Sequence, residues 1–240
     1  MKQNIILTKS NKLVHGTVQL TGSKSECNRA LIIEALSDGR VKVENISDAA
    51  DAVTLAGILK SEVGMPNAEV LEGQNTIPNS TFRTPHSNPS EINIGPAGTA
   101  MRFLTAYFAI GDEEVILTGS ERMKQRPIGI LVEALRELGA HIDYVENEGF
   151  PPIKLKGSFE QLSNKVSIKG NISSQYVTAL LLIAARLPFG LELHIEGELT
   201  SRPYVEMTLA MLEAAGIQHT WKGNVIDIPN QEFANTSLYI

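Results

Sequence analysis

Hydrophobic and polar positions recur with helical spacing in three places along the chain, and the surroundings of each place are alike. A turn rich in Gly, Ser and Thr leads into an apolar helix, and a short stretch of strand-forming residues follows it. The three segments are residues 21–46, 95–120 and 170–197. Self-similar segments at a fixed period indicate a repeat architecture. The pattern therefore predicts three copies of one structural unit.

A second helix follows the first in each copy. These helices have the sequences DAVTLAGILKSEVG, RPIGILVEALRELGA and RPYVEMTLAMLEAAG, in which apolar positions recur every three to four residues. They end near Gly64, Gly139 and Gly216, which lie 75 and 77 residues apart. The last two helices open with Arg-Pro, and proline is favoured in the first turn of a helix. Strand-like stretches, such as 152–156 and 224–229, follow the last two helices.

The three units are expected to pack together, because a helix pair of this kind cannot bury its apolar face alone. We therefore predict a shared helical core with sheets outside it. Residues 71–89 are rich in Asn, Ser and Pro, which is typical of a long exposed connection. The first twenty residues precede the first unit and are expected to belong elsewhere in the structure.

Composition excludes several classes of protein. The chain has no apolar run of about 18 residues, which a transmembrane helix needs, and its richest run, Ala179–Ala185, is better explained as a buried helix. Residues 1–12 lack the apolar core of a signal peptide. The net charge of −6 argues against nucleic-acid binding. A single cysteine, Cys27, excludes an internal disulfide framework and is typical of the reducing cytoplasm.

Small hydroxyl residues, which are preferred N-caps, open the first helix of every unit. They are Ser23 and Ser25, Thr99, and Ser173 with Ser174. If the units pack with approximate threefold symmetry, several helix starts point to one end, where free N–H groups and partial positive charge attract anions. Cationic side chains lie near these starts in the sequence, at Lys24, Arg29, Arg102, Lys124 and Arg126. The pattern therefore predicts an anionic ligand.

The first motif has a plain structural alternative. In GSKSECNR, residues 22–29, the side chains of Lys24, Ser25 and Arg29 suit a phosphate or carboxylate. An ordinary capped helix with exposed basic residues explains the same pattern equally well. The segment is not a P-loop, because Ser23 separates the glycine from the lysine.

The other polar motifs also allow both a ligand-binding and a purely structural explanation. The glycines of GPAGTAMR, residues 95–102, allow a backbone to approach a ligand, although a tight turn is the commoner reason for them. RMKQR, residues 122–126, holds three cations that either bind anions or form a solvated turn, which is the commoner case. Five further residues either cap a helix or also donate to a ligand: Ser173, Ser174, Gln175, Ser201 and Tyr204.

The sequence gives little support for a metal site or for a reactive cysteine. The histidines at 15, 86, 141, 194 and 219 form no pair at i, i+4 and no cluster with cysteine, so we expect no metal site. Cys27 lies inside the first motif without a companion base. A buried or bystander thiol is favoured over a nucleophile.

Taken together, the motifs resemble those of EPSP synthase, an enzyme of the shikimate pathway. GSKSECNRALIIEAL, AGTAMRFL, RMKQRPIGILVEALRELGA, ISSQYVTALLL and SRPYVEMTLAML occur in that family's order and spacing and cover nearly all of the chain. The resemblance implies an inverse α/β fold, in which two domains each hold three βαβαββ units and close over the substrates. It assigns residues 21–238 to the amino-terminal substrate-binding domain, 1–20 to the second domain and 239–240 to the start of the hinge.

The resemblance also implies the ligands and the residues that bind them. Shikimate 3-phosphate is expected at Lys24, Ser25, Arg29, Ser173, Ser174, Gln175, Ser201 and Tyr204. Phosphoenolpyruvate is expected at Lys24, Gly98, Arg126 and Gln175. The chain departs from the family at Pro96, where Asn is usual, and at Phe103, where Pro is frequent. Both residues flank Gly98 and affect the shape of the phosphoenolpyruvate pocket.

The implied reaction moves a carboxyvinyl group from phosphoenolpyruvate to the 5-hydroxyl of shikimate 3-phosphate and releases phosphate. It needs an acid, a base and cations that hold several negative charges together, but neither metal nor cofactor. In the family, the Asp and Glu that transfer protons lie in the second domain and have no counterpart here. The chain alone is therefore expected to be inactive, with Lys24 in a supporting role, and the full-length protein is expected to be a cytoplasmic monomer.

Two alternatives remain at this stage. The UDP-N-acetylglucosamine carboxyvinyltransferases share the fold, but they typically have Lys-Asn in the first motif and a reactive Cys before the Arg-Pro helix. This chain has Ser-Lys-Ser in the first motif and no Cys in residues 119–125. The other alternative is a non-catalytic module that binds phosphate ligands and keeps the fold.

Overall fold

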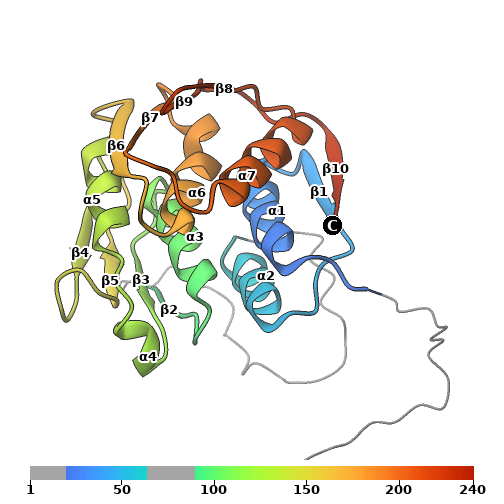
Figure 1. The fold of residues 1–240 in the computed structure, drawn as a ribbon. Helices are drawn as coiled ribbons and strands as arrows, with labels where there is room; N and C mark the ends of the chain where they lie inside the picture. The colour runs from blue at the N-terminus through green and yellow to red at the C-terminus, as the bar shows by residue number, and fades with distance from the viewer. Residues whose placement is uncertain (1–19, 64–89) are drawn as a thin grey trace, which may run out of the picture.

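The computed structural model describes residues 20–63 and 90–240, and it places helices at the centre with the sheets around them (Figure 1). The first unit contains α1 (Lys24–Leu36), β1 (Val41–Glu44) and α2 (Ala50–Val63). The second contains β2 (Ser90–Asn93), α3 (Gly98–Ala109), β3 (Val115–Thr118), α4 (Glu121–Lys124), α5 (Gly129–Leu138), β4 (Ile142–Tyr144) and β5 (Ile153–Leu155). The third contains β6 (Lys165–Lys169), α6 (Ser174–Ile183), η1 (Ala184–Arg186), β7 (Leu191–Glu196), α7 (Arg202–Ala214), β8 (Thr220–Lys222) and β9 (Val225–Ile228), and β10 (Thr236–Tyr239) follows it.

The second and third units have the same sheet topology. Their strand orders are β2-β3-β5-β4 and β6-β7-β9-β8. In each sheet the first two strands are parallel and the remaining pairs are antiparallel. The repeat seen in the sequence is therefore a repeat of structure.

The first unit is completed by the last strand of the chain. β1 pairs in parallel with β10, so that Val41 lies opposite Thr236 and Glu44 lies opposite Tyr239. This is the pairing that β3 makes with β2, and β7 with β6. In the described residues, β10 therefore takes beside β1 the place that β2 takes beside β3 and β6 beside β7, and it joins the third unit to the first.

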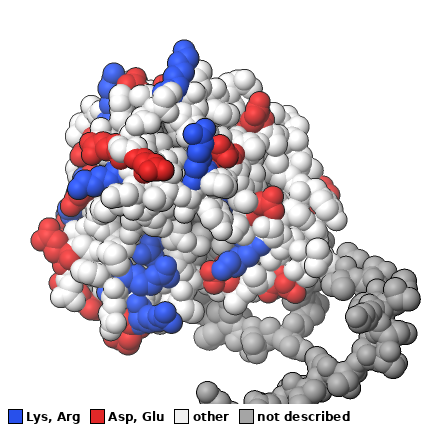
Figure 2. Space-filling model, in the orientation of Figure 1, with Lys and Arg blue, Asp and Glu red and all other residues white. Residues whose placement is uncertain are grey.

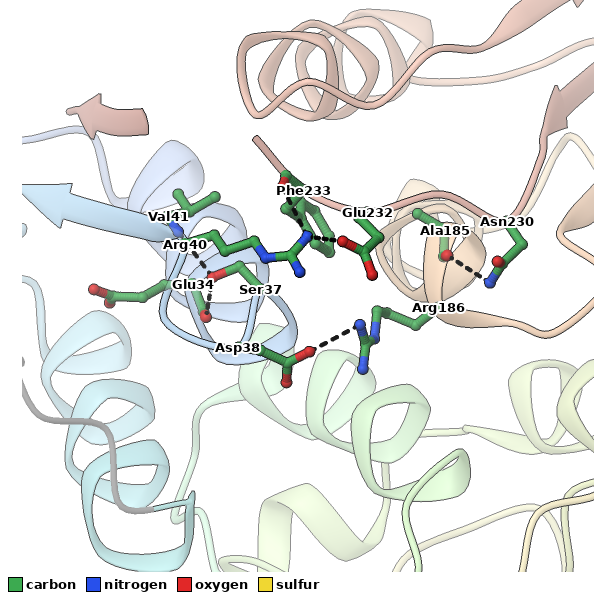
Figure 3. Close-up of polar contacts among 10 residues, drawn as sticks. All are labelled: Glu34, Ser37, Asp38, Arg40, Val41, Ala185, Arg186, Asn230, Glu232 and Phe233. Atoms are coloured by element: carbon green, nitrogen blue, oxygen red, sulfur yellow. Dashed lines mark hydrogen bonds and ion pairs between the residues drawn. The ribbon is translucent and has the colours of Figure 1, made fainter. Parts of the chain in front are cut away.

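Side-chain contacts support this connection (Figure 3). Arg40 forms an ion pair with Glu232 and donates a hydrogen bond to the carbonyl of Phe233 at 3.4 Å. The carbonyl of Arg40 accepts a hydrogen bond from the backbone N–H of Thr236 at 3.1 Å. Asp38, just after α1, forms an ion pair with Arg186 of η1 at 3.0 Å. These contacts join the end of α1 to the third unit.

The helices α1, α3 and α6 form the centre of the hydrophobic core. Every side chain of α6 from Tyr176 to Ile183 is buried. α3 packs against α6, and α1 contacts both. The predicted arrangement of a helical core with sheets outside is therefore confirmed. In the described residues, no helix has both the length and the apolar character that a membrane crossing requires.

Several local predictions about helix starts were wrong. Pro127 does not open α5, because the N–H of Ile128 donates to the carbonyl of Gly149 at 2.8 Å and holds residue 128 outside the helix. Thr99 is not an N-cap, because α3 begins one residue earlier, at Gly98. Ser23 is the N-cap of α1, although its side chain forms no capping hydrogen bond. Ser25 and Ser174, also predicted as N-caps, lie inside α1 and α6 instead.

Other predictions about starts and boundaries have different outcomes. Ser173 caps α6 as expected, since its hydroxyl accepts from the N–H of Gln175. Pro203 lies in the first turn of α7 as expected. The polar connection at 71–89 and residues 1–19 of the segment assigned to the second domain lie outside the described residues. Tyr239 still belongs to β10, and the start of the hinge at 239–240 stays a prediction.

Gly139 allows a direct test of this packing. It ends α5 with φ of 114°, and a Cβ added there would lie 1.9 Å from the carbonyl oxygen of Glu160. Gly149 also has a positive φ, 83°, but an added Cβ meets no atom within 4 Å. We expect Gly139→Ala to lower the free energy of unfolding by about 2 to 4 kcal/mol, because backbone strain and a steric clash combine. Gly149→Ala should cost about 1 to 2 kcal/mol through strain alone.

Urea denaturation followed by circular dichroism measures both losses. Equal losses for the two variants would contradict the close approach of Gly139 to Glu160.

Candidate anion-binding site at the helix starts

Hydrogen bonds donated by side chains join α1, α3, α6 and α7 near the starts of these helices. Gln175, at the start of α6, donates through Nε2 to Oγ1 of Thr99, at the start of α3, at 3.1 Å. Arg29, on the second turn of α1, donates to the carbonyl of Tyr204 in the first turn of α7 at 3.3 Å. The helix starts of three units therefore meet, as the sequence predicted.

The opposite ends of α1 and α3, with η1, which follows α6, line a cavity of about 500 Å³. Its lining includes Leu36 at the end of α1 and Asp38 just after it, Tyr107 and Ile110 at the end of α3, and Arg186 of η1. None of the predicted ligand residues lines this cavity. Burial, followed by the charges of Glu113 and Asp38, raises the pKa of Tyr107 to about 12. The starts and the ends of the central helices therefore lie apart, with opposite partial charges.

Arg29 is buried, with 4% of its surface exposed, and is the most deeply enclosed of the predicted ligand residues that have a polar side chain. Nε donates to Thr208 at 2.8 Å and Nη1 to the carbonyl of Ser25 at 2.6 Å. Nη2 donates to Thr178 at 3.4 Å and to the carbonyl of Tyr204. These bonds use four of the five N–H donors of a guanidinium, so one Nη1–H remains for a ligand.

All hydrogen-bond partners of Arg29 are neutral. Among the described side chains of residues 20–61 and 90–240, no carboxylate forms an ion pair with it, although the charge of Glu26 acts against the lowering of its pKa. The aromatic rings of Phe103 and Tyr204 lie 5.7 Å from its guanidinium carbon. Burial lowers the pKa of Arg29 to about 10. A buried cation is normally paired, so this arrangement favours an anion at the site.

Arg102 is a second buried arginine without a described carboxylate partner, with 3% of its surface exposed. Nη1 donates to the carbonyl of Gly98 at 3.2 Å, and Nη2 donates to the carbonyl of Pro127 at 2.7 Å. Burial lowers its pKa, and the nearby charge of Arg126 lowers it further. Arg102 therefore links the start of α3 to the segment between α4 and α5.

Gly98 and Arg126, both predicted to bind phosphoenolpyruvate, lie in contact. A Cβ added to Gly98 would lie 1.9 Å from Nη1 of Arg126, so a side chain at position 98 would displace the guanidinium from its present place. Within the described part of the chain, Arg126 forms no hydrogen bond or ion pair. Its charge is therefore available to an anion.

The remaining cations are neutralised by carboxylates. Lys24 lies 3.4 Å from Asp51, with 51% of its side chain exposed. Lys124 lies 3.0 Å from Glu146 and 3.6 Å from Glu121. Figure 2 shows Lys and Arg side chains gathered at the lower left of the molecule, where Figure 1 places α4.

The predicted polar ligand residues lie around this ring of helix starts. Ser25 and Ser174 are half-buried, whereas Ser173, Ser201 and Tyr204 are exposed. Ser201 precedes α7 in a left-handed conformation, with φ of 57°. The side chains of Lys24 and Gln175 reach Asp51 and Thr99 rather than each other. Their roles toward the two substrates stay predictions.

Three buried hydroxyl groups of the site were missed from the sequence. Thr178 and Thr208 accept from Arg29, and the hydroxyl of Tyr176 donates to the carbonyl of Pro127 at 2.7 Å. Thr178 and Thr208 are threonines in otherwise apolar helix faces, and Tyr176 directly follows the Ser-Ser-Gln motif. These positions in the sequence were the signal that could have identified the three residues as part of the site.

Cys27 is buried, and burial raises the pKa of its thiol. This environment favours an unreactive thiol. In the described ranges, no group of three or more His, Cys, Asp and Glu side chains is arranged to hold a metal ion.

The fold and the helix starts define an inverse α/β domain of the enolpyruvyl-transferase type. The family model described as EPSP synthase (3-phosphoshikimate 1-carboxyvinyltransferase) matches residues 8–237. The chain belongs to the EPSP synthase family.

Individual relatives agree with this assignment. The 3-phosphoshikimate 1-carboxyvinyltransferase of Bacteroides fragilis (strain YCH46) is 44% identical over 208 residues, which cover 87% of this chain and 44% of that protein. The enzyme of the same name from Pectobacterium carotovorum subsp. carotovorum (strain PC1) is 41% identical over 216 residues, covering 86% and 48%. The chain spans about half the length of the curated relatives it matches.

A solved structure shows the same fold. The EPSP synthase structure from Acinetobacter baumannii matches with a TM-score of 0.71 at 19% identity, over 94% of this chain and 49% of that one.

Inorganic phosphate tests whether the helix starts attract anions. We expect phosphate to raise the unfolding midpoint of the chain, because a ligand that binds only the folded state stabilises it. The shift should be smaller in Arg126→Gln, which removes the unpaired cation next to Gly98. Arg122→Gln is the matched control, because it removes an equal charge from an exposed arginine four residues away. Equal phosphate shifts in the two variants would show that net charge alone is responsible.

Proposed function

We propose that this chain forms the part of a 3-phosphoshikimate 1-carboxyvinyltransferase that binds shikimate 3-phosphate and phosphoenolpyruvate. The observation that carries the proposal is the pair of buried arginines, Arg29 and Arg102, at helix starts with only neutral described partners. Both substrates are anionic, and helix starts with arginine donors are suited to phosphate and carboxylate groups. The family assignment then selects the substrates.

Shikimate 3-phosphate is proposed to lie over the starts of α1, α6 and α7. Ser25, Arg29, Ser173, Ser174, Ser201 and Tyr204 surround this region, with Lys24 and Gln175 at its border with the second substrate. Arg29 contributes one free N–H and an uncancelled positive charge. The hydroxyl groups of the serines and of Tyr204 would donate to the phosphate and the ring hydroxyls.

Phosphoenolpyruvate is proposed to lie at the start of α3, against Gly98 and Arg126, within reach of Lys24 and Gln175. The cations of both sites hold several negative charges together, which the developing transition state requires. By resemblance, the carboxylates that transfer protons belong to a second domain. The part proposed for this chain in the shikimate pathway is therefore binding and alignment. We also propose that the full-length protein is a monomer and that it acts in the cytoplasm.

Calorimetric titration with shikimate 3-phosphate tests the first site. We expect the chain to bind this substrate, and Arg29→Lys to weaken binding by about 1 kcal/mol or more, because lysine cannot reproduce the planar set of donors. Arg136→Lys is a matched control. Arg136 also donates to a backbone carbonyl, that of Ile142, and lies over a tyrosine ring, that of Tyr144, but on the outer side of the domain.

A loss of affinity in Arg29→Lys alone supports the proposed site. Equal effects of the two substitutions would point to general destabilisation and contradict it. If the unsubstituted chain binds no shikimate 3-phosphate even beside a separately prepared carboxyl-terminal half of a relative, the proposed function is wrong.

A further inference from the structure

The carbonyl of Pro127 is the common acceptor of two buried donors from different helices. The hydroxyl of Tyr176, on α6, donates to it at 2.7 Å, and Nη2 of Arg102, on α3, donates to it at 2.7 Å. Tyr176 is 6% exposed and Arg102 is 3% exposed. The guanidinium of Arg102 also lies 6.0 Å from the ring centre of Tyr176. One backbone oxygen therefore ties α3 and α6 to the segment between α4 and α5.

The segment between α4 and α5 belongs to neither helix, so helical hydrogen bonds do not hold it in place. Its backbone bonds run from the N–H of Arg126 to the carbonyl of Met123 at 3.0 Å and from the N–H of Ile128 to the carbonyl of Gly149 at 2.8 Å. Pro127 itself has no N–H to donate. The carbonyl of Pro127 is thus the group through which side chains of α3 and α6 hold the middle of the segment by hydrogen bonds.

The position of Arg126 depends on these hydrogen bonds to the carbonyl of Pro127. Its side chain forms no hydrogen bond or ion pair with another described residue, and it packs over the space that the missing Cβ of Gly98 leaves. Nothing polar in the described part of the chain holds the guanidinium itself. The place of the guanidinium over Gly98 therefore depends on where the backbone of residues 126–128 holds the base of the side chain.

We infer that Tyr176 is a positioning residue for Arg126. Its hydroxyl fixes the carbonyl of Pro127, and this holds the guanidinium of Arg126 over Gly98, where an anionic carboxylate or phosphate group can meet it. The inference rests on the proposed function for the identity of that ligand, phosphoenolpyruvate. Tyr176 acts through the backbone and need not touch the ligand.

The chemistry of the side chain supports a specific role for the hydroxyl. A phenylalanine ring would fill the same buried space between α3 and α6, so packing alone does not call for tyrosine. A buried hydroxyl costs free energy unless it is hydrogen-bonded, and here its described acceptor is the carbonyl of Pro127. The preceding residue, Gln175, bonds to Thr99, so two consecutive residues of α6 tie its start to α3 and to the Arg126 segment.

Tyr176→Phe isolates this bond, because it removes one oxygen and keeps the ring. We expect the dissociation constant for phosphoenolpyruvate to rise about fivefold, the scale of one lost neutral hydrogen bond, and that for shikimate 3-phosphate to stay unchanged. Tyr107→Phe is the matched control, because it removes a tyrosine hydroxyl of the same helical core at the end away from the site. It should change neither constant. A Tyr176→Phe protein that binds phosphoenolpyruvate as the unsubstituted chain does overturns the inference.

A second measurement keeps the inference separate from the proposed function. Phenylglyoxal modifies arginines according to their accessibility, and mass spectrometry reports each site. In Tyr176→Phe, the modification rate of Arg126 relative to Arg122 should rise, with buried Arg29 still protected. An unchanged ratio overturns the inference even if the chain binds no phosphoenolpyruvate. Failure of the unsubstituted chain to bind phosphoenolpyruvate, together with a raised ratio, would instead contradict the proposed ligand and leave the positioning role supported.

Discussion

A buried guanidinium without a carboxylate beside it is the constraint on which the candidate site depends. Removing an arginine from water is costly unless its donors are bonded and its charge is compensated. Carbonyl and hydroxyl oxygens accept from four donors of Arg29 and from two of Arg102, but these neutral groups form no ion pair with either guanidinium. Burial lowers the pKa of both residues, and the helix starts around them add partial positive charge. A bound anion lowers the energy of all these groups together, because each prefers negative charge at the same place.

Arg29 lies where the first and third units meet. Its partners come from α6 and α7 of the third unit, whereas Arg29 itself belongs to the first. β10 joins these units, since it follows the third unit in sequence and pairs with β1 of the first. The contacts of Arg40 with Glu232 and Phe233 strengthen the same connection. The pairing of β1 with β10 and the packing of α1 against α6 and α7 thus join the same two units that meet at Arg29.

The sequence was sufficient for features with a local signal. The three units, their paired helices and the helical core follow from apolar spacing and from turn residues, and the structure confirms them. The pairing of β1 with β10 could not be predicted, because residues 41 and 236 share no local pattern. The start of α5 was misplaced because the hydrogen bond from Ile128 to Gly149 outweighs the preference of proline for a first turn. The buried acceptors Thr178 and Thr208 follow from tertiary packing, which spacing along the chain does not reveal.

The cations near the helix starts therefore differ in what a ligand must displace. Lys24 is exposed and paired with Asp51, and an exposed pair contributes only about 0 to 1 kcal/mol. A multiply charged anion can take the place of Asp51 at little cost. Lys124 has two carboxylates within 4 Å, so a ligand there would compete with both. Arg126, two residues later, has no described partner to give up. Lys124 and Arg126 of the RMKQR turn are thus not equivalent, although the sequence presents them in one basic cluster.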